Sequence, residues 1–302
     1  MAIAEGTGSS IPLYFAAVYS GALFGDNLSI ISDTTIAATT GAGCEMKDKF
    51  RMNLLIALPA AVVTVVAFAM MSSGTEQITG ELTYSLVKII PYVYVLIAAI
   101  MGMDVFVVLV SGTFLAGFVG LATGSMTLSG FAQSIGTGMS GMMTTAIVAI
   151  LLRGLIGIIT VYGGIDWLVS VLRRRVRTRK GAEYCIGFMS GLLDFALINN
   201  TIAIMIAAPL AKDIAEEHHI APKRNASLLD IFACAVHGLA PHAGGMLTLS
   251  GFYAALNPLA VVKYNFYCYF LILAAVITIQ FGLLRTPEEK EYARQAKEKN
   301  KV

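Results

Sequence analysis

Apolar residues gather in long runs along the chain, and polar residues fall in short stretches between them. A helix crosses the hydrocarbon core of a bilayer with about 20 residues, so runs of this length predict transmembrane helices. The two-residue alternation typical of membrane-spanning strands is missing from the pattern. The runs that are long enough to span are Leu54–Met71, Leu82–Met101, Val105–Ala122, Gly141–Val161 and Tyr264–Leu284.

Three other apolar segments are interrupted by polar residues. In the first segment, the stretch Gly25–Thr35 separates two short apolar arms. In the second, Asn199-Asn200-Thr201 joins the arms Cys185–Ile198 and Ile202–Leu210. In the third, Ala240–Gly245 contains a proline, which removes a helical hydrogen bond, so the helix should unwind there. Within a bilayer such polar stretches persist only when they are buried in protein or line a wet cavity.

Composition agrees with a membrane protein. The mean hydropathy is +0.74, 57% of the residues are hydrophobic and only 13% are charged, whereas about a quarter are charged in a typical soluble domain. Glycines with alanine and serine beside them suit helices that pack closely in lipid. The sequence therefore predicts an all-α, polytopic membrane helical bundle with broken helices and the lipid bilayer as its surroundings.

The positions of basic residues predict the topology. Lys and Arg in Cys44–Arg51, in Arg173–Lys180 and in the tail Arg285–Val302 indicate cytoplasmic loops. All three lie on one side of the membrane only if Cys185–Leu210 is a re-entrant hairpin. Counting the spans from the first basic loop makes Thr123–Gly138 a long outer loop. On this topology the two broken segments run in opposite directions, which is typical of inverted-repeat transporters.

These assignments divide the chain into four parts. They are the first broken transmembrane segment (1–43), transmembrane helices with a basic cytoplasmic loop (44–184), the re-entrant hairpin with the second broken segment and the last transmembrane helix (185–284), and a charged cytoplasmic tail (285–302). The four cysteines have no paired spacing, and we expect no cofactor. An enzyme is not expected, since no nucleophile–base pair or metal spacing occurs, and the basic residues indicate lipid contact rather than nucleic acid.

Two carboxylates stand out in the first interruption. Asp26 and Asp33 are seven residues apart, about two helical turns, so one side of a partly wound segment can present both. Carboxylate, hydroxyl and carbonyl oxygens are the ligands of hard cations such as sodium. We hypothesise that Asp33 exchanges sodium and protons and that Asp26 orients the site or helps to coordinate. The alternative is that both residues only cap half-helices.

The later interruptions supply further candidates. Asn199, Asn200 and Thr201 can offer amide and hydroxyl oxygens from a hairpin tip, or they can simply form a turn. His242 can titrate in the physiological range, or it can tie the unwound backbone by hydrogen bonding. Asp194 is either a ligand or a polar contact, and Asp230 is expected to face the bundle interior as a structural partner.

The motif Gly25-Asp26-x-x-Ser29-x-x-Ser32-Asp33-Thr34-Thr35, followed by Gly41-Ala42-Gly43-Cys44, resembles the signature of the NhaC-type sodium/proton antiporter family of the ion transporter superfamily. The segments Asn199–Thr201, Ala221–Lys223 and Leu228–Gly245 resemble its second half. The resemblance implies two inverted repeats, each with a hairpin and a broken helix, and sodium/proton exchange in a cell membrane, here the bacterial cytoplasmic membrane. The site residues expected from the motifs and interruptions are Asp26, Asn27, Ser29, Ser32, Asp33, Thr34, Asn199, Asn200, Thr201 and His242.

The sequence departs from the family pattern in two ways. Ile30 stands where proline is common, and Ala240–Ala243 lacks the expected polar run, which keeps open a sodium- or proton-coupled carrier of a small organic solute. Family members also have an additional N-terminal region with the first hairpin. We therefore expect a truncated version of a longer transporter, which can be an inactive fragment; the alternative is that a homo-oligomer supplies the missing hairpin from another subunit.

Overall fold

A computed structural model describes residues 10–29, 32–71, 86–101, 103–164, 167, 170–171, 176–253, 256–287 and 289–290. Every regular element among these residues is a helix, as the sequence predicts. The chain forms two compact units, Met1–Gln77 with Thr145–Val302, and Ile78–Thr144. The expected outer loop Ser72–Glu81, the arginines at 173–175 and the tail from residue 291 lie outside the described residues, as does Ile30.

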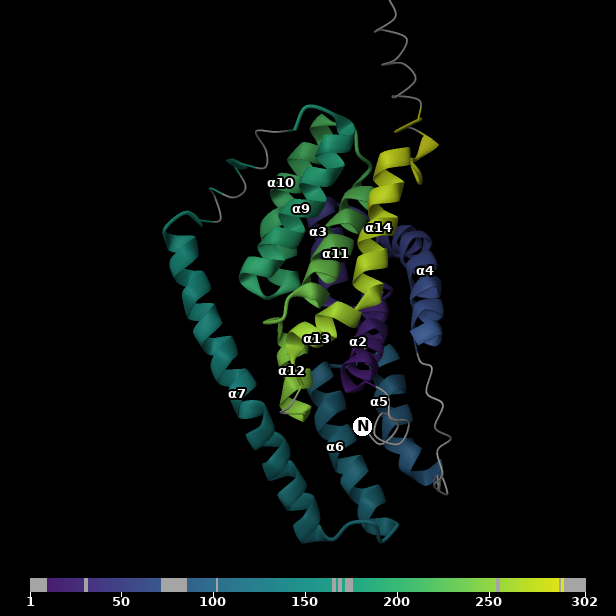
Figure 1. The fold of residues 1–302 in the computed structure, drawn as a ribbon, viewed down its shortest axis with the longest axis vertical. Helices are drawn as coiled ribbons and strands as arrows, with labels where there is room; N and C mark the ends of the chain where they lie inside the picture. Colours follow the sequence, from purple (N-terminus) through teal and green to yellow (C-terminus); the bar gives the residue numbers. More distant parts are fainter. Residues whose placement is uncertain are drawn as a thin grey trace, which may run out of the picture. The chain divides into compact units, whose positions relative to one another are not determined.

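The first unit is built around one helix, α11 (Pro222–Leu239), shown in green in Figure 1. It packs against helices from both ends of the sequence, and all of its residues from Arg224 to Ala235 are buried, as is Gly238. The helices in contact with it are α2 (Ile11–Asn27), α3 (Asp33–Ala42), α4 (Met46–Met71), α9 (Arg179–Leu197), α10 (Asn200–Glu217) and α14 (Phe266–Phe281).

Small residues allow α9 to approach α11 closely. A Cβ atom on Gly187 would lie 2.6 Å from the ring of Phe232, and one on Gly191 would lie 2.8 Å from Val236. Real Cβ atoms do not come this close, so each glycine makes room for a side chain of α11. This is the packing expected where small residues bring helix backbones together in lipid.

The two predicted broken transmembrane segments, interrupted at Gly25–Thr35 and at Ala240–Gly245, are present as breaks between helices. The first separates α2 from α3, between Asn27 and Asp33, and the second separates α11 from α12 (Gly244–Phe252). The arms α9 and α10 form a helical hairpin, and at its open end Arg179 donates to the carbonyl of His219 at 3.0 Å. The inverted-repeat relation and the re-entrant depth of the hairpin stay predictions.

Helix α14 covers most of the predicted span Tyr264–Leu284, and a bend that the sequence did not predict lies directly before this helix. The structure has a short helix, α13 (Pro258–Tyr264), bent by 47° from α14. Asn265 lies in this bend and is fully buried. Its side chain accepts from Ser20 of α2 at 2.8 Å and donates to the carbonyl of Gly238 at 2.8 Å, so the bend is fixed to two other helices.

The second unit contains a helical hairpin of its own. The helices η1 (Leu86–Ile89), α5 (Ile90–Ile100) and α6 (Val105–Ala122) follow one another, and Asp104 caps α6 by accepting from Phe106 and Val107. The prediction of a long loop over Thr123–Gly138 is wrong, because helix α7 (Leu128–Val161) begins at Leu128. Glycine and serine lower helix propensity without preventing a helix, and only the residues up to 127 form the connection.

Two helices among the described residues are long and apolar enough to cross a bilayer. They are Met46–Met71 and the stretch Pro222–Gly251, and the bent pair of α13 and α14 makes up to three if it is one span. Leu86–Val95 and Phe106–Ala122 are shorter apolar helices. Fold and composition together therefore give an all-α membrane helical bundle.

Candidate functional site

The two carboxylates of the first break lie at the facing ends of two half-helices. Asp26 belongs to the last turn of α2, and Asp33 is the first residue of α3. The N-cap of α3 is Ser32, whose Oγ accepts from the amide of Thr35 at 3.2 Å. Neither aspartate is therefore the N-cap residue itself, although Asp33 lies in the first turn of α3.

Asp33 is connected to the hairpin tip. Its Oδ2 accepts a hydrogen bond from Oγ1 of Thr201 at 2.8 Å, and its Oδ1 accepts from the amide of Thr34 at 3.1 Å. The side chain is exposed at one end of a cavity of about 420 Å³ between α3 and α10. The cavity is lined by Asp33, Ile36, Ala37, Thr40, Gly41, Thr201, Met205, Ala208 and Pro209. The structure thus joins candidates from the first and second interruptions.

The other residues of the tip have structural contacts. Asn199 is the N-cap of α10, and its Oδ1 accepts from the amide of Ile202 at 2.9 Å. The amide oxygen of Asn199 therefore stabilises the turn, which agrees with the alternative that these residues simply form a turn. Asn200 begins α10, directly before Thr201. The left-handed backbone of Ile198, at φ 56°, reverses the chain just ahead of them.

The remaining candidates of the first break separate into two groups. Ser32 and Thr34 lie beside Asp33, with their hydroxyl oxygens 2.7 Å apart, and the carbonyl of Ser29 accepts from Thr35 at 2.8 Å. Asn27 instead points into the bundle core. Its amide nitrogen bonds to Sγ of Cys234 at 3.2 Å and to the hydroxyl of Tyr267 at 3.1 Å.

The second break is fastened to the hairpin rather than brought to Asp33. Nε2 of His242 lies 3.1 Å from the carbonyl oxygen of Phe195, and the two rings make an edge contact with centroids 4.7 Å apart. Nδ1 of His237 lies 3.2 Å from Oδ1 of the buried Asp194. These contacts favour the role of holding unwound backbone over direct participation of His242 in the ion site.

Sequence reasoning missed a fully buried ion pair. Lys49, assigned to a cytoplasmic loop, lies inside α4 and is fully buried against Asp230 of α11, with Nζ 2.7 Å from Oδ2. Asn53, one helical turn further along, donates to the same oxygen at 2.7 Å. Asp230 does face the bundle interior with structural partners, as expected. Lys49 and Asn53 are four residues apart, which places both on one face of a helix, and this spacing is the sequence signal that could have indicated a shared partner.

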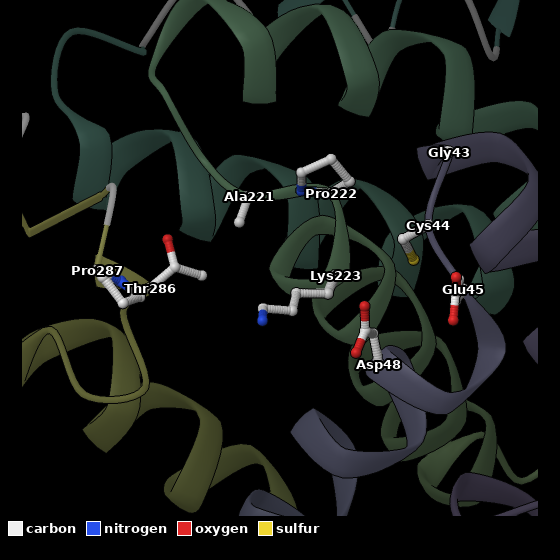
Figure 2. Close-up of a pocket in the computed structure, with 9 residues that line it drawn as sticks. All are labelled: Gly43, Cys44, Glu45, Asp48, Ala221, Pro222, Lys223, Thr286 and Pro287. Carbon is white, nitrogen blue, oxygen red and sulfur yellow. The ribbon is translucent and has the colours of Figure 1, made fainter.

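A second cavity, of about 440 Å³, lies where three chain segments meet (Figure 2). Its walls come from the connection between α3 and α4 with the start of α4, the start of α11, and residues 286–287 beyond α14. In Figure 2 the amino group of Lys223 extends into the cavity, away from the carboxylate of Asp48. Two of these segments, the connection between α3 and α4 and the residues beyond α14, were predicted to be cytoplasmic. Burial raises the pKa of the Cys44 thiol at this cavity to about 11, and the nearby Asp48 adds to the rise.

Comparison with known proteins identifies the family. The profile of the Na⁺/H⁺ antiporter family matches residues 21–285, which include both breaks and the hairpin. The chain belongs to this family. It is 25% identical over 323 aligned positions to the Na(+)/H(+) antiporter NhaC of Alkalihalophilus pseudofirmus, covering 96% of this chain and 69% of that protein. This agrees with the NhaC-type resemblance of the sequence motif.

A shorter similarity points to a related transporter. The chain is 40% identical over 68 residues to a malate-2H(+)/Na(+)-lactate antiporter of Bacillus subtilis, covering 22% of this chain and 14% of that protein. No solved structure matches. Family membership supports sodium/proton exchange across a membrane and does not favour the organic-solute carrier. The family is a class of transporters and not of enzymes.

Proposed function

We propose that this protein exchanges sodium for protons at Asp33, in the membrane of a bacterial cell. The observation that carries the proposal is the 2.8 Å hydrogen bond between Asp33 and Thr201, because it joins the carboxylate of the first break to the hairpin tip. The exposed carboxylate opens onto a cavity, so ions can reach it. Family membership supplies the class of reaction.

The chemistry follows from competition for one carboxylate. A proton on Asp33 neutralises the charge that attracts sodium, and a bound sodium ion displaces the proton. Oxygen atoms of Thr201, Ser32 and Thr34 lie at or beside the carboxylate and suit a hard cation. Asp26 lies close enough to interact electrostatically with Asp33, and its position at the end of α2 adds negative potential to the break.

The candidate site residues have different roles in this proposal. Asp33, Ser32, Thr34 and Thr201 form the proposed ion site, and Asp26 orients the field around it. Asn199, Asn200 and His242 hold the hairpin tip and the second break in place. Asn27 and Ser29 shape the first break through hydrogen bonds of their own.

Proteoliposomes loaded with a pH-sensitive dye test the proposal. Addition of sodium should dequench the dye for the unmodified protein, and Asp33→Asn should abolish the response. Asp213→Asn is the matched control, since Asp213 is an exposed aspartate on α10, the helix that also carries Thr201. Exchange by Asp33→Asn at the rate of the control would overturn the assignment. A dequenching response to an organic acid or amino acid, but not to sodium, would instead indicate the carrier.

A further inference from the structure

A buried lysine occupies an unusual position next to the first break. Lys49 and Asp230 have exposed fractions of 0% and 1%, and Nζ lies 2.7 Å from Oδ2 of the carboxylate. Nζ also donates to Oγ1 of Thr35 at 2.7 Å. Desolvating two charges costs several kcal/mol per ion unless they are paired and hydrogen-bonded, so each charge here depends on the other.

The surroundings of this ammonium group resemble those of a hard cation. It is held by a carboxylate oxygen and a hydroxyl oxygen, which are the ligand types that sodium takes from proteins. The hydroxyl of Thr35 donates its own hydrogen to the carbonyl of Ser29 at 2.8 Å, and its oxygen accepts from both Lys49 at 2.7 Å and Ser32 at 3.2 Å. The ammonium group therefore lies between two oxygen ligands, one of them on α3 directly after the first break.

Two further oxygen atoms beside the pair have no hydrogen-bond donor among the described residues. Asn53 donates through Nδ2 to Asp230 and, at 3.0 Å, to the carbonyl of Asn27, whereas its Oδ1 is unpartnered. Oδ1 of Asn27 is unpartnered too. Both side chains are buried, with exposed fractions of 0% and 1%. Unpaired buried acceptors are costly and rare, and a cation is the kind of group that satisfies them.

We infer that Lys49 is a tethered cation that fills a second sodium site, formed by Asp230 and Thr35 with the unpartnered amide oxygen of Asn53 as a further ligand that the ammonium group does not use, and thereby keeps Asp230 out of the exchange. Removal of the ammonium group leaves a carboxylate and neutral oxygens around a vacant position, to which sodium can bind. Lys49 thus limits the exchangeable carboxylates of the first break to Asp33 and Asp26. This last consequence, though not the site itself, rests on the proposed function.

The test is a set of thermal unfolding measurements on purified full-length protein in detergent, in sodium chloride and in choline chloride. All variants carry Asp26→Asn and Asp33→Asn, which remove the proposed cargo site. Adding Lys49→Met should create a sodium-specific rise in Tm of about 3 °C, the shift for a site at about ten times its Kd in a chain of this size. Adding Asp230→Asn as well should abolish the rise.

The results separate the inference from the proposed function. A sodium-specific rise already present in the Asp26→Asn/Asp33→Asn background would contradict the cargo site, while the increment from Lys49→Met would still measure the second site. Equal Tm values for the Lys49→Met variant in both salts would overturn the inference.

A second variant decides the matter if the unpaired Asp230 prevents folding. Lys49→Met/Asp230→Asn in the otherwise unmodified protein removes both charges together, and such neutral replacements of buried ion pairs are commonly tolerated. It should fold and exchange sodium for protons in proteoliposomes with an unchanged sodium-to-proton ratio. Failure of this variant to fold, loss of its exchange or a changed ratio would overturn the inference.

Discussion

Thr201 donates its hydroxyl hydrogen to Oδ2 of Asp33 at 2.8 Å, across 168 residues of sequence. This contact joins the start of α3 to the first turn of α10. The hairpin and the broken helix therefore meet at the carboxylate to which we assign the exchange, and the environment of that carboxylate can be altered from either element.

Replacing Thr201 should weaken sodium binding without unfolding the protein. Thr201→Val keeps the shape but removes the hydroxyl, and a hydrogen bond to a charged group contributes about 1.5–3 kcal/mol. We expect the sodium concentration for half-maximal exchange to rise about tenfold or more, since each 1.4 kcal/mol corresponds to tenfold. Thr201→Ser keeps the hydroxyl and is the control. Equal half-maximal concentrations for the two variants would contradict a role for the hydroxyl.

The packing of α3 against α10 gives a second way to move Asp33. A Cβ atom on Gly41 would collide with Cβ of Ala208. Gly41→Ala should therefore separate the two helices, destabilise the protein by about 1–3 kcal/mol as overpacking does, and lower exchange. The compensating variant Gly41→Ala/Ala208→Gly should restore both Tm and exchange, and no recovery in this pair would show that the collision is not the cause.

A buried ion pair outside the breaks should matter for stability alone. Arg224 donates to Oε2 of Glu183 at 3.0 Å and to Thr278 at 2.9 Å, joining α11 to α9 and α14. Arg224→Met leaves Glu183 buried beside only the more distant Arg179, at 3.4 Å, and breaking such a pair costs about 3–5 kcal/mol. Thermal unfolding should show a large loss that Arg224→Met/Glu183→Leu partly reverses. A Tm unchanged by Arg224→Met would refute this.

Cys44 gives a pH-dependent prediction away from the transmembrane segments. Because burial raises its pKa to about 11, the reactive thiolate is scarce at neutral pH and increases about tenfold per pH unit between pH 7 and 9. Maleimide labelling at pH 8 should be about a hundredfold slower than for a free thiol of pKa 8.5. The other cysteines are buried, and Cys44→Ala identifies their background. Labelling that is fast and independent of pH would exclude the raised pKa.

Sequence patterns were sufficient to locate the breaks and the hairpin. Acidic and hydroxyl side chains within apolar arms, as in Gly25–Thr35, can be accommodated in a membrane only where the helix is interrupted, so composition alone marked the place. The hairpin was predicted from charge, because the three basic segments lie together on the cytoplasmic side only if Cys185–Leu210 turns back within the membrane. In the structure both predictions appear as helix ends at Asn27, Asp33, Leu197 and Asn200.

Other features depend on tertiary contacts that local patterns do not report. Lys49 lies among basic residues that indicate a cytoplasmic loop, and only its contact with Asp230, 181 positions away, explains its burial. Asn265 and the nearby Lys263 are two polar residues at the start of a long apolar run, too weak a signal to predict the bend before α14. The link of Thr201 to Asp33 likewise required the helices to be packed, although both residues were candidates from the sequence.

The position of Asn265 restricts how this transporter can move. By holding Ser20 and the carbonyl of Gly238 at once, one amide group clamps the first half-helix, the end of the central helix and the final bend into a single rigid joint. These three segments can therefore move apart only if both hydrogen bonds of Asn265 break.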